Sequence, residues 1–128
     1  MKFKLIHHRH YRKMEVVKKS KIEIEIGLDK DNFPAEINWS STDAPVGYPV
    51  QNAKAMLLSF LDRDSRDTLK IDLWTKDMEV AEMDRMMFYT LRALADTYYK
   101  ASNNRELAEQ MQQFAHYFGE KTEQLKPK

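Results

Sequence analysis

Cysteine is absent from this 128-residue chain, and glycine and proline are scarce, with three and four residues. Without cysteine the chain can form neither a disulfide framework nor a thiolate site for a nucleophile or a metal. The glycines, Gly27, Gly47 and Gly119, are too dispersed for a glycine-rich phosphate-binding loop. These absences argue against several common classes of redox, metal-binding and nucleotide-binding protein.

Long hydrophobic runs are missing as well. No window approaches the roughly 18 consecutive apolar residues of a membrane helix. The start, MKFKLIHHRHYRK, has basic residues but not the apolar segment of a secretory signal. We therefore expect a cytoplasmic protein without a transmembrane segment.

Charge is unevenly distributed, although the net charge is only +1. Residues 1–19 hold seven basic residues against Glu15 alone, so this segment carries +6 and the remainder carries −5. Apolar residues show no clear period in this segment. We therefore predict that it is a basic, disordered extension, followed by a single domain over residues 20–128. The functional alternative is a basic arm that meets an acidic partner or lipid headgroups. The acidic body argues against nucleic-acid binding, because phosphate contacts need a basic face.

Alternation of apolar and polar residues predicts four strands. Ser20–Leu28 alternates isoleucine with charged residues, and Ala35–Ser41 returns after the turn sequence DKDNFP. Lys54–Asp62 is compatible with a short helix or a strand; we favour the strand, because a turn-like segment and the alternating Thr68–Trp74 follow at once. The expected result is a four-stranded antiparallel sheet made of two hairpins.

From Val80 onward the apolar period is helical. Asp77 is expected to cap this helix, and Ser102-Asn103-Asn104 to end it. A second helix follows, and the short connection makes the two helices antiparallel. The predicted fold class is therefore α+β, with a C-terminal helical hairpin packed on one face of the sheet. The predicted apolar stripes are Val80, Met83, Met87, Leu91, Leu94 and Tyr98 on the first helix, and Leu107, Met111, Phe114, Phe118 and Leu125 on the second.

Candidate catalytic and metal-binding residues are few. His116 is the only histidine of the body, and no nucleophile motif accompanies it. Asp29–Asn32 is similar to the opening of a calcium loop, but a proline and a serine stand where that loop needs glycine and glutamate. A hydrolase using Asp72 or Asp77 has only the presence of acidic residues in its favour. We expect no enzyme, no cofactor and no metal site.

A surface for a protein partner is the favoured hypothesis. If the strand isoleucines face the helices, Asp72 and Trp74 face outward, with Leu57 or Leu58 beside them according to the register. An exposed tryptophan beside a leucine is typical of an interaction site, whereas the alternative is a Trp74 covered within the monomer. A small-ligand carrier, with a pocket between sheet and helices, is a further alternative. With candidates from the first helix, the predicted surface comprises Leu57, Asp72, Trp74, Phe88, Tyr89 and Tyr99.

The chain also resembles a known family. TLKIDLWTKDM at Thr68–Met78, EINWS at Glu36–Ser40 and NAKAMLLSF at Asn52–Phe60 are similar to the gliding motility GldC family, and the likeness extends over about residues 20–123. The resemblance implies a small, soluble, cytoplasmic accessory protein of gliding in Bacteroidetes-type bacteria, with no catalytic residue. The expected partner is an unidentified protein, such as a component of the gliding machinery, or a second copy of the chain.

Overall fold

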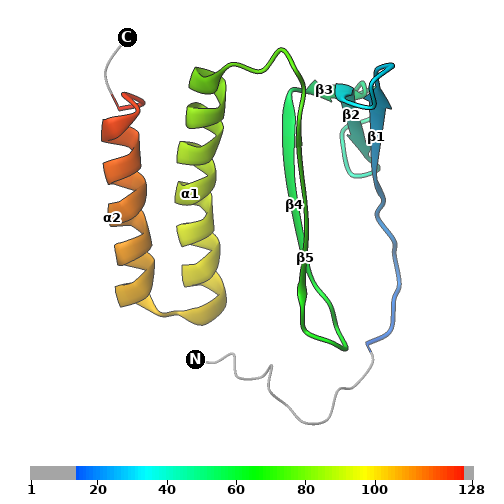
Figure 1. Ribbon diagram of the computed structural model, residues 1–128. Coiled ribbons are helices and arrows are strands. Elements are labelled where there is room, and N and C mark those ends of the chain that lie inside the picture. The colour runs from blue at the N-terminus through cyan, green and yellow to red at the C-terminus, as the bar shows by residue number, and fades with distance from the viewer. Residues whose placement is uncertain (1–13, 126–128) are drawn as a thin grey trace. The chain divides into compact units, whose positions relative to one another are not determined.

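This computed structural model describes residues 14–125, which form two compact units (Figure 1). One unit, Glu15–Met78, contains the strands, and the other, to which Met14 and the chain from Glu79 onward belong, contains the helices. The predicted α+β class is confirmed. Most of the predicted basic extension lies outside the described residues, and residues 14–19 have no regular secondary structure. The single domain and the packing of the hairpin on the sheet stay predictions.

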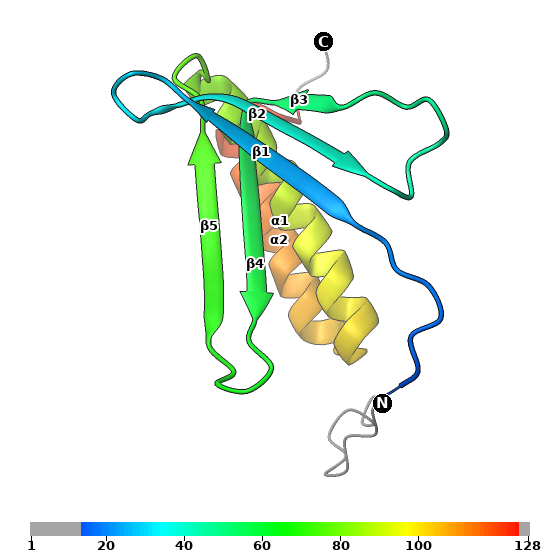
Figure 2. The same cartoon turned by 90° about the vertical axis from the view of Figure 1, so that its right-hand side faces the viewer.

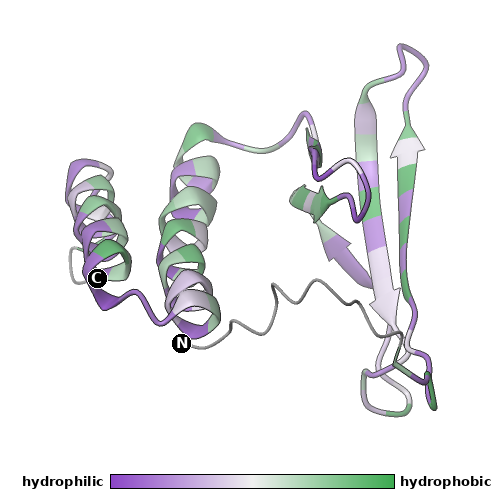
Figure 3. Cartoon of the chain, turned by 90° about the horizontal axis from the view of Figure 1, so that it is seen from below, coloured by the Kyte–Doolittle hydropathy of each residue, from purple (hydrophilic) through white to green (hydrophobic). Residues whose placement is uncertain are grey.

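The first three strands form an antiparallel sheet in the order β1-β2-β3. They are β1 (Ile22–Leu28), β2 (Pro34–Ser41) and β3 (Gln51–Ala53). Hydrophobic and hydrophilic positions alternate along the longer strands (Figure 3), so one face gathers the apolar side chains. On that face Ile37 lies opposite Ile26 and Ala53 and is only 1% exposed. The sequence did not predict β3, because three residues are too few to show an alternation.

The remaining strands, β4 (Ala55–Leu61) and β5 (Thr68–Trp74), form a separate two-stranded antiparallel ribbon. The strand predicted over Lys54–Asp62 is confirmed, but the single four-stranded sheet is wrong. The chain bends at Lys54, so the residues before it pair with β2 and those after it pair with β5. The two sheets run in different directions (Figure 2).

A buried threonine closes the ribbon at this bend. The backbone N–H of Thr75 donates to the carbonyl oxygen of Lys54 at 2.8 Å, and the Thr75 hydroxyl lies 3.3 Å from the same oxygen. The hydroxyl also donates to the carboxylate of Asp77. The following helix has Glu79 as its N-cap, and the Asp77 carboxylate bonds Thr75 instead, so the prediction that Asp77 caps this helix is wrong. Thr75 therefore links the end of the ribbon to the segment that follows β5.

The helices are α1 (Val80–Ser102) and α2 (Arg105–Lys121). Glu79 is the N-cap of α1, and the carboxylate of Glu82 accepts a hydrogen bond from its N–H at 2.9 Å in a capping box. Asn103 adopts a left-handed conformation with φ of 59° and ends α1. The side chain of Asn104 then accepts from the N–H of Leu107 at 3.1 Å and begins α2. The short connection makes the helices antiparallel neighbours, as predicted (Figure 1).

Small residues form much of the seam between the helices. Ala95 of α1 and Ala108, Ala115 and Gly119 of α2 are buried. The ring of Phe88 occupies the space that a side chain at position 119 would fill, since a Cβ built there would overlap the ring. The wide apolar arcs of both helices (Figure 3) are therefore only partly used in the seam.

Candidate functional site

Three of the predicted surface residues share one face of the β4–β5 ribbon. The register pairs Leu57 with Asp72 and Ala55 with Trp74, and side chains of opposed residues point to the same side of a sheet. The register therefore places Leu57, not Leu58, on the same side of the ribbon as Trp74. Trp74 is 55% exposed and Leu57 is 38% exposed. We call this side the Trp74 face: Ala55, Leu57, Ser59, Leu61, Thr68, Lys70, Asp72 and Trp74.

The opposite side of the ribbon is apolar throughout. We call it the leucine face: Met56, Leu58, Phe60, Leu69, Ile71 and Leu73. A two-stranded hairpin is marginally stable in water unless more strands or a packed layer cover its apolar side. Phe60, Leu69 and Ile71 are nevertheless exposed. The ribbon therefore carries apolar side chains on both faces, and among the described residues no further strand pairs with its edges.

The Trp74 face also carries one ion pair. Lys70 Nζ contacts Asp72 Oδ2 two positions along β5, and both side chains are largely exposed. An exposed pair of this kind contributes at most about 1 kcal/mol to stability. The pair matters here because it places a positive and a negative charge on the same face of one strand.

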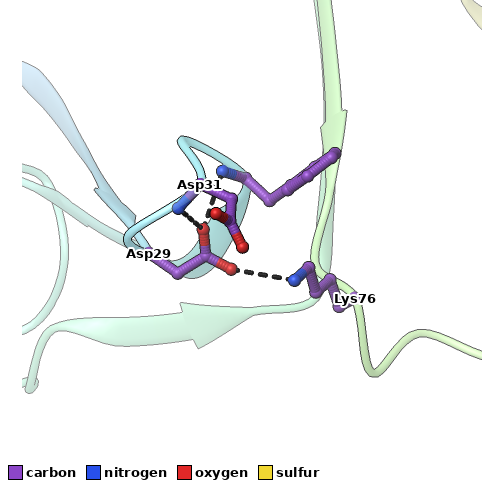
Figure 4. Close-up of polar contacts among 4 residues, drawn as sticks. Asp29, Asp31 and Lys76 are labelled. Atoms are coloured by element: carbon purple, nitrogen blue, oxygen red, sulfur yellow. Dashed lines mark hydrogen bonds and ion pairs between the residues drawn. The ribbon is translucent and has the colours of Figure 1, made fainter.

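A second polar cluster lies at the β1–β2 turn, within the same unit (Figure 4). Asp29 accepts hydrogen bonds from the backbone N–H groups of Asp31 at 2.8 Å and Phe33 at 3.1 Å. Its other carboxylate oxygen lies 3.0 Å from the ammonium of Lys76, just after β5. The same ammonium stands 4.8 Å from the centroid of the Phe33 ring. These contacts connect the β1–β2 turn to the end of the β4–β5 ribbon.

The contacts of Asp29 lower its pKa below the ordinary value of 3.8. The N–H of Phe33 has the largest effect, followed by the hydrogen bond from Lys76 and the N–H of Asp31. Each of these donors favours the ionised carboxylate. The cluster is therefore a structural one, and its strength should depend on pH.

We expect Asp29 to make the stability of the protein sensitive to acid. Its contribution is present above the pKa of an unfolded aspartate and is lost as the pH falls through the lower folded value. Below about pH 4, wild-type stability should therefore fall more steeply than that of Asp29→Asn. Urea unfolding across this range measures the difference, with Asp64→Asn as a control for the loss of a carboxylate. Equal pH dependence in wild type and Asp29→Asn would contradict the prediction.

The predicted residues of α1 differ in accessibility. Tyr89 is exposed, with the guanidinium groups of Arg85 and Arg92 at 5.0 and 5.9 Å from its ring centroid. The hydroxyl of Tyr99 accepts a hydrogen bond from Arg105 at 2.9 Å. Phe88, in contrast, is only 2% exposed, so it is a core residue of the hairpin and takes no part in the surface that we propose.

A groove of about 460 Å³ lies on the helical hairpin. Arg92 stands in its lining with the guanidinium 5.5 Å from the centroid of Phe88. His116 is also part of the lining, and its Nε2 lies 3.6 Å from a carboxylate oxygen of Glu120 one turn later. Sequence reasoning treated His116 as a surface residue and did not single out Arg92, because the groove depends on the packing of α1 against α2.

The acidic residues with shifted pKa values are not arranged as proton donors. The pKa of Asp77 is lowered, chiefly by the Thr75 hydroxyl, and that of Asp62 by the N–H of Ser65. A general acid at neutral pH needs a raised pKa. Within residues 14–125, no group of three or more histidine and acidic side chains is arranged to hold a metal ion. In the same segment, no helix is long and apolar enough to cross a membrane.

Comparison with known proteins gives one match. The model of a family described as gliding motility-associated protein GldC-like matches residues 34–124. No curated protein and no solved structure matches the chain. The matched segment begins with β2 and includes the ribbon and both helices. Since it covers most of the sequence, the chain belongs to the GldC-like family of gliding motility-associated proteins.

Proposed function

We propose that this protein is a non-enzymatic, cytoplasmic accessory factor of gliding in Bacteroidetes-type bacteria. It acts by binding another protein, such as a component of the gliding machinery, and the Trp74 face is the principal contact. Membership of the GldC-like family supports the cellular process. The exposure of Trp74 is the observation that carries the choice of surface.

The composition of the Trp74 face suits a protein partner. Trp74 and Leu57 supply large apolar contact area, and Lys70 and Asp72 supply charges of both signs on the same side. Interfaces commonly combine a central aromatic anchor with a polar rim. Burying a tryptophan side chain that is more than half exposed contributes a large hydrophobic free energy to binding.

The tyrosines of α1 form a second candidate contact region. Tyr89 has two arginines near its ring, and the hydroxyl of Tyr99 accepts a hydrogen bond from Arg105. Tyrosine and arginine are enriched among the residues that dominate binding energies, because each combines a flat surface with hydrogen-bonding groups. We propose that Tyr89 and Tyr99 contribute to partner binding on the helical unit.

The case for a role without catalysis rests on the chemistry of the acidic groups. Asp77, one of the two acids that a hydrolase could use, has its pKa moved away from neutrality by its bond to Thr75. Asp72 stands on the open Trp74 face beside Lys70. A lowered pKa at Asp77 is the opposite of what a general acid needs at neutral pH.

We expect Trp74→Ala to impair function while leaving the fold intact. Removing a central aromatic anchor typically costs 2 kcal/mol or more of binding energy, about a thirtyfold loss of affinity. A gliding strain whose only copy carries Trp74→Ala should therefore spread poorly on agar at normal protein levels. The variant should also recover less partner than wild type in affinity purification, with unchanged circular dichroism.

Trp39→Ala is the matched control, because Trp39 is an exposed tryptophan on the other sheet. It should spread and capture the partner as wild type does. If Trp74→Ala unfolds the protein, Trp74 is a core residue and the proposed surface is wrong. Normal spreading of folded Trp74→Ala would also exclude this face as the contact.

A further inference from the structure

The outer edge of β5 presents unpaired backbone groups. Among the described residues, β5 pairs with β4 alone. Hydrogen bonds at the two ends of the ribbon, from Thr75 N–H to the Lys54 carbonyl and from Asp62 N–H to the Asp67 carbonyl, define which residues face β4. Since this pattern alternates, Leu69, Ile71 and Leu73 direct their backbone groups toward β4. The backbone groups that point outward belong to Thr68, Lys70, Asp72 and Trp74.

We propose that β5 pairs antiparallel with β5 of a second copy, centred on Ile71, so that two ribbons become one four-stranded sheet. In this register Lys70 lies opposite Asp72 of the other copy, and Thr68 lies opposite Trp74. All four outward-pointing residues then exchange hydrogen bonds, up to about eight in total. Ile71, which directs its backbone toward β4, falls at a position that needs no bond across the new junction.

The charges of β5 distinguish this register from its neighbours. A symmetric antiparallel pairing that keeps the outward groups together can also be centred on Lys70 or on Asp72. Those registers place Lys70 opposite Lys70, or Asp72 opposite Asp72, and like charges directly opposed are destabilising. Of these three registers, only the one centred on Ile71 opposes unlike charges. A lone edge lysine usually discourages pairing, but here Asp72 of the second copy supplies its complement.

The same pairing extends the leucine face. Leu69 lies opposite Leu73 of the second copy and Ile71 opposite Ile71, so the apolar sides of both ribbons become continuous. A sheet of three or more strands with an apolar face is more stable than an isolated hairpin. The outer edge of β4 has no comparable pattern, because Ala55–Leu61 contains no charged residue to select a register. The sequence of β5 therefore favours a second copy of the chain as the strand that pairs with this edge.

A charge-exchange experiment on the full chain tests this assignment. Lys70→Asp places two opposed pairs of aspartates in the dimer, and Asp72→Lys places two opposed pairs of lysines. Each variant alone should associate at least about tenfold more weakly than wild type. An equimolar mixture of the two restores two unlike pairs and should form a heterodimer. Sedimentation equilibrium or light scattering measures the oligomeric state, and circular dichroism verifies that each variant is folded.

The mixture separates the proposal from a role of the ion pair within one chain. Neither variant regains the Lys70–Asp72 pair of its own strand, so rescue on mixing can come only from contact between copies. Lys30→Asp makes the same charge change in the β1–β2 turn and should leave the dimer unaffected. A wild-type chain that stays monomeric at concentrations up to about 1 mM overturns the proposal. Dimers that persist in both single variants, or failure of the mixture to associate, overturn it as well.

This inference does not depend on the proposed function. Pairing uses the backbone edge of β5, whereas the proposed partner contacts the side chains of the Trp74 face. Loss of gliding in Trp74→Ala with an intact dimer would support the partner surface alone, and loss of the dimer in the charge variants would support the β5 edge alone.

Discussion

Phe88→Ala is expected to lower the free energy of unfolding by about 3–5 kcal/mol, because it removes a buried ring and leaves a cavity in the seam. The ring of Phe88 fills the space above Gly119 and is almost fully buried. Beside it the seam contains chiefly alanines, whose short side chains cannot move in to fill the gap. Denaturant unfolding followed by the helical signal measures the loss.

Phe114→Ala is the matched control, since Phe114 is 53% exposed on α2. The same change of side chain there should cost about 1 kcal/mol or less, because little apolar area returns to water. Equal losses for the two variants would show that Phe88 does not hold the seam together.

The partner of Phe88 supplies an independent check. Gly119→Ala improves helix propensity by about 1 kcal/mol. The added Cβ would nevertheless overlap the Phe88 ring, with Cδ1 only 2.8 Å away, and overpacking of this kind costs about 1–3 kcal/mol. We expect a net destabilisation in wild type and a gain when Phe88 is already alanine. A double-mutant cycle measures this coupling.

Ile37→Ala is expected to destabilise the three-stranded sheet by about 2–5 kcal/mol. Ile37 pairs with Ile26 on one side and with Ala53 on the other, so its side chain connects all three strands. Its loss removes the one fully buried large side chain of that sheet. Thermal or denaturant unfolding followed by tryptophan fluorescence is suitable, because Trp39 belongs to the same face.

Ile22→Ala provides the comparison for this prediction. Ile22 belongs to β1 on the same apolar face but is 68% exposed. Its replacement should change the stability by less than about 1 kcal/mol. A large effect at Ile22, or a small one at Ile37, would place the core of this sheet elsewhere.

Much of the candidate surface could be predicted from sequence because strands have a strict period of two. Alternation in Thr68–Trp74 is enough to place Asp72 and Trp74 on one side. It cannot decide between Leu57 and Leu58, because that choice depends on which residue of β4 lies opposite Asp72. The structure supplies the register and, with it, the contrast between the Trp74 face and the leucine face.

Phe88 shows why the helical part was harder to predict. Phe88 lies beside two methionines and a tyrosine in the sequence, a pattern that predicts apolar side chains exposed to a partner. Burial of Phe88 depends on Gly119, a residue 31 positions away whose missing side chain makes room for the ring. Two large apolar residues of the predicted α2 stripe, Leu107 and Phe114, are about half exposed instead. Periodicity identifies a helix, but it does not show where a small residue allows close packing.

The sequence by itself determined the long elements of this protein, because the period of each segment and its flanking turn residues are local properties. Alternation defined β1, β2 and β5, and the helical stripes with Asn103 and Asn104 defined the helical hairpin. Only the tertiary structure decided that Lys54 separates two sheets, that β3 joins the first of them, and that Phe88 is core. Each of these outcomes depends on contacts between distant residues, which a local pattern cannot specify.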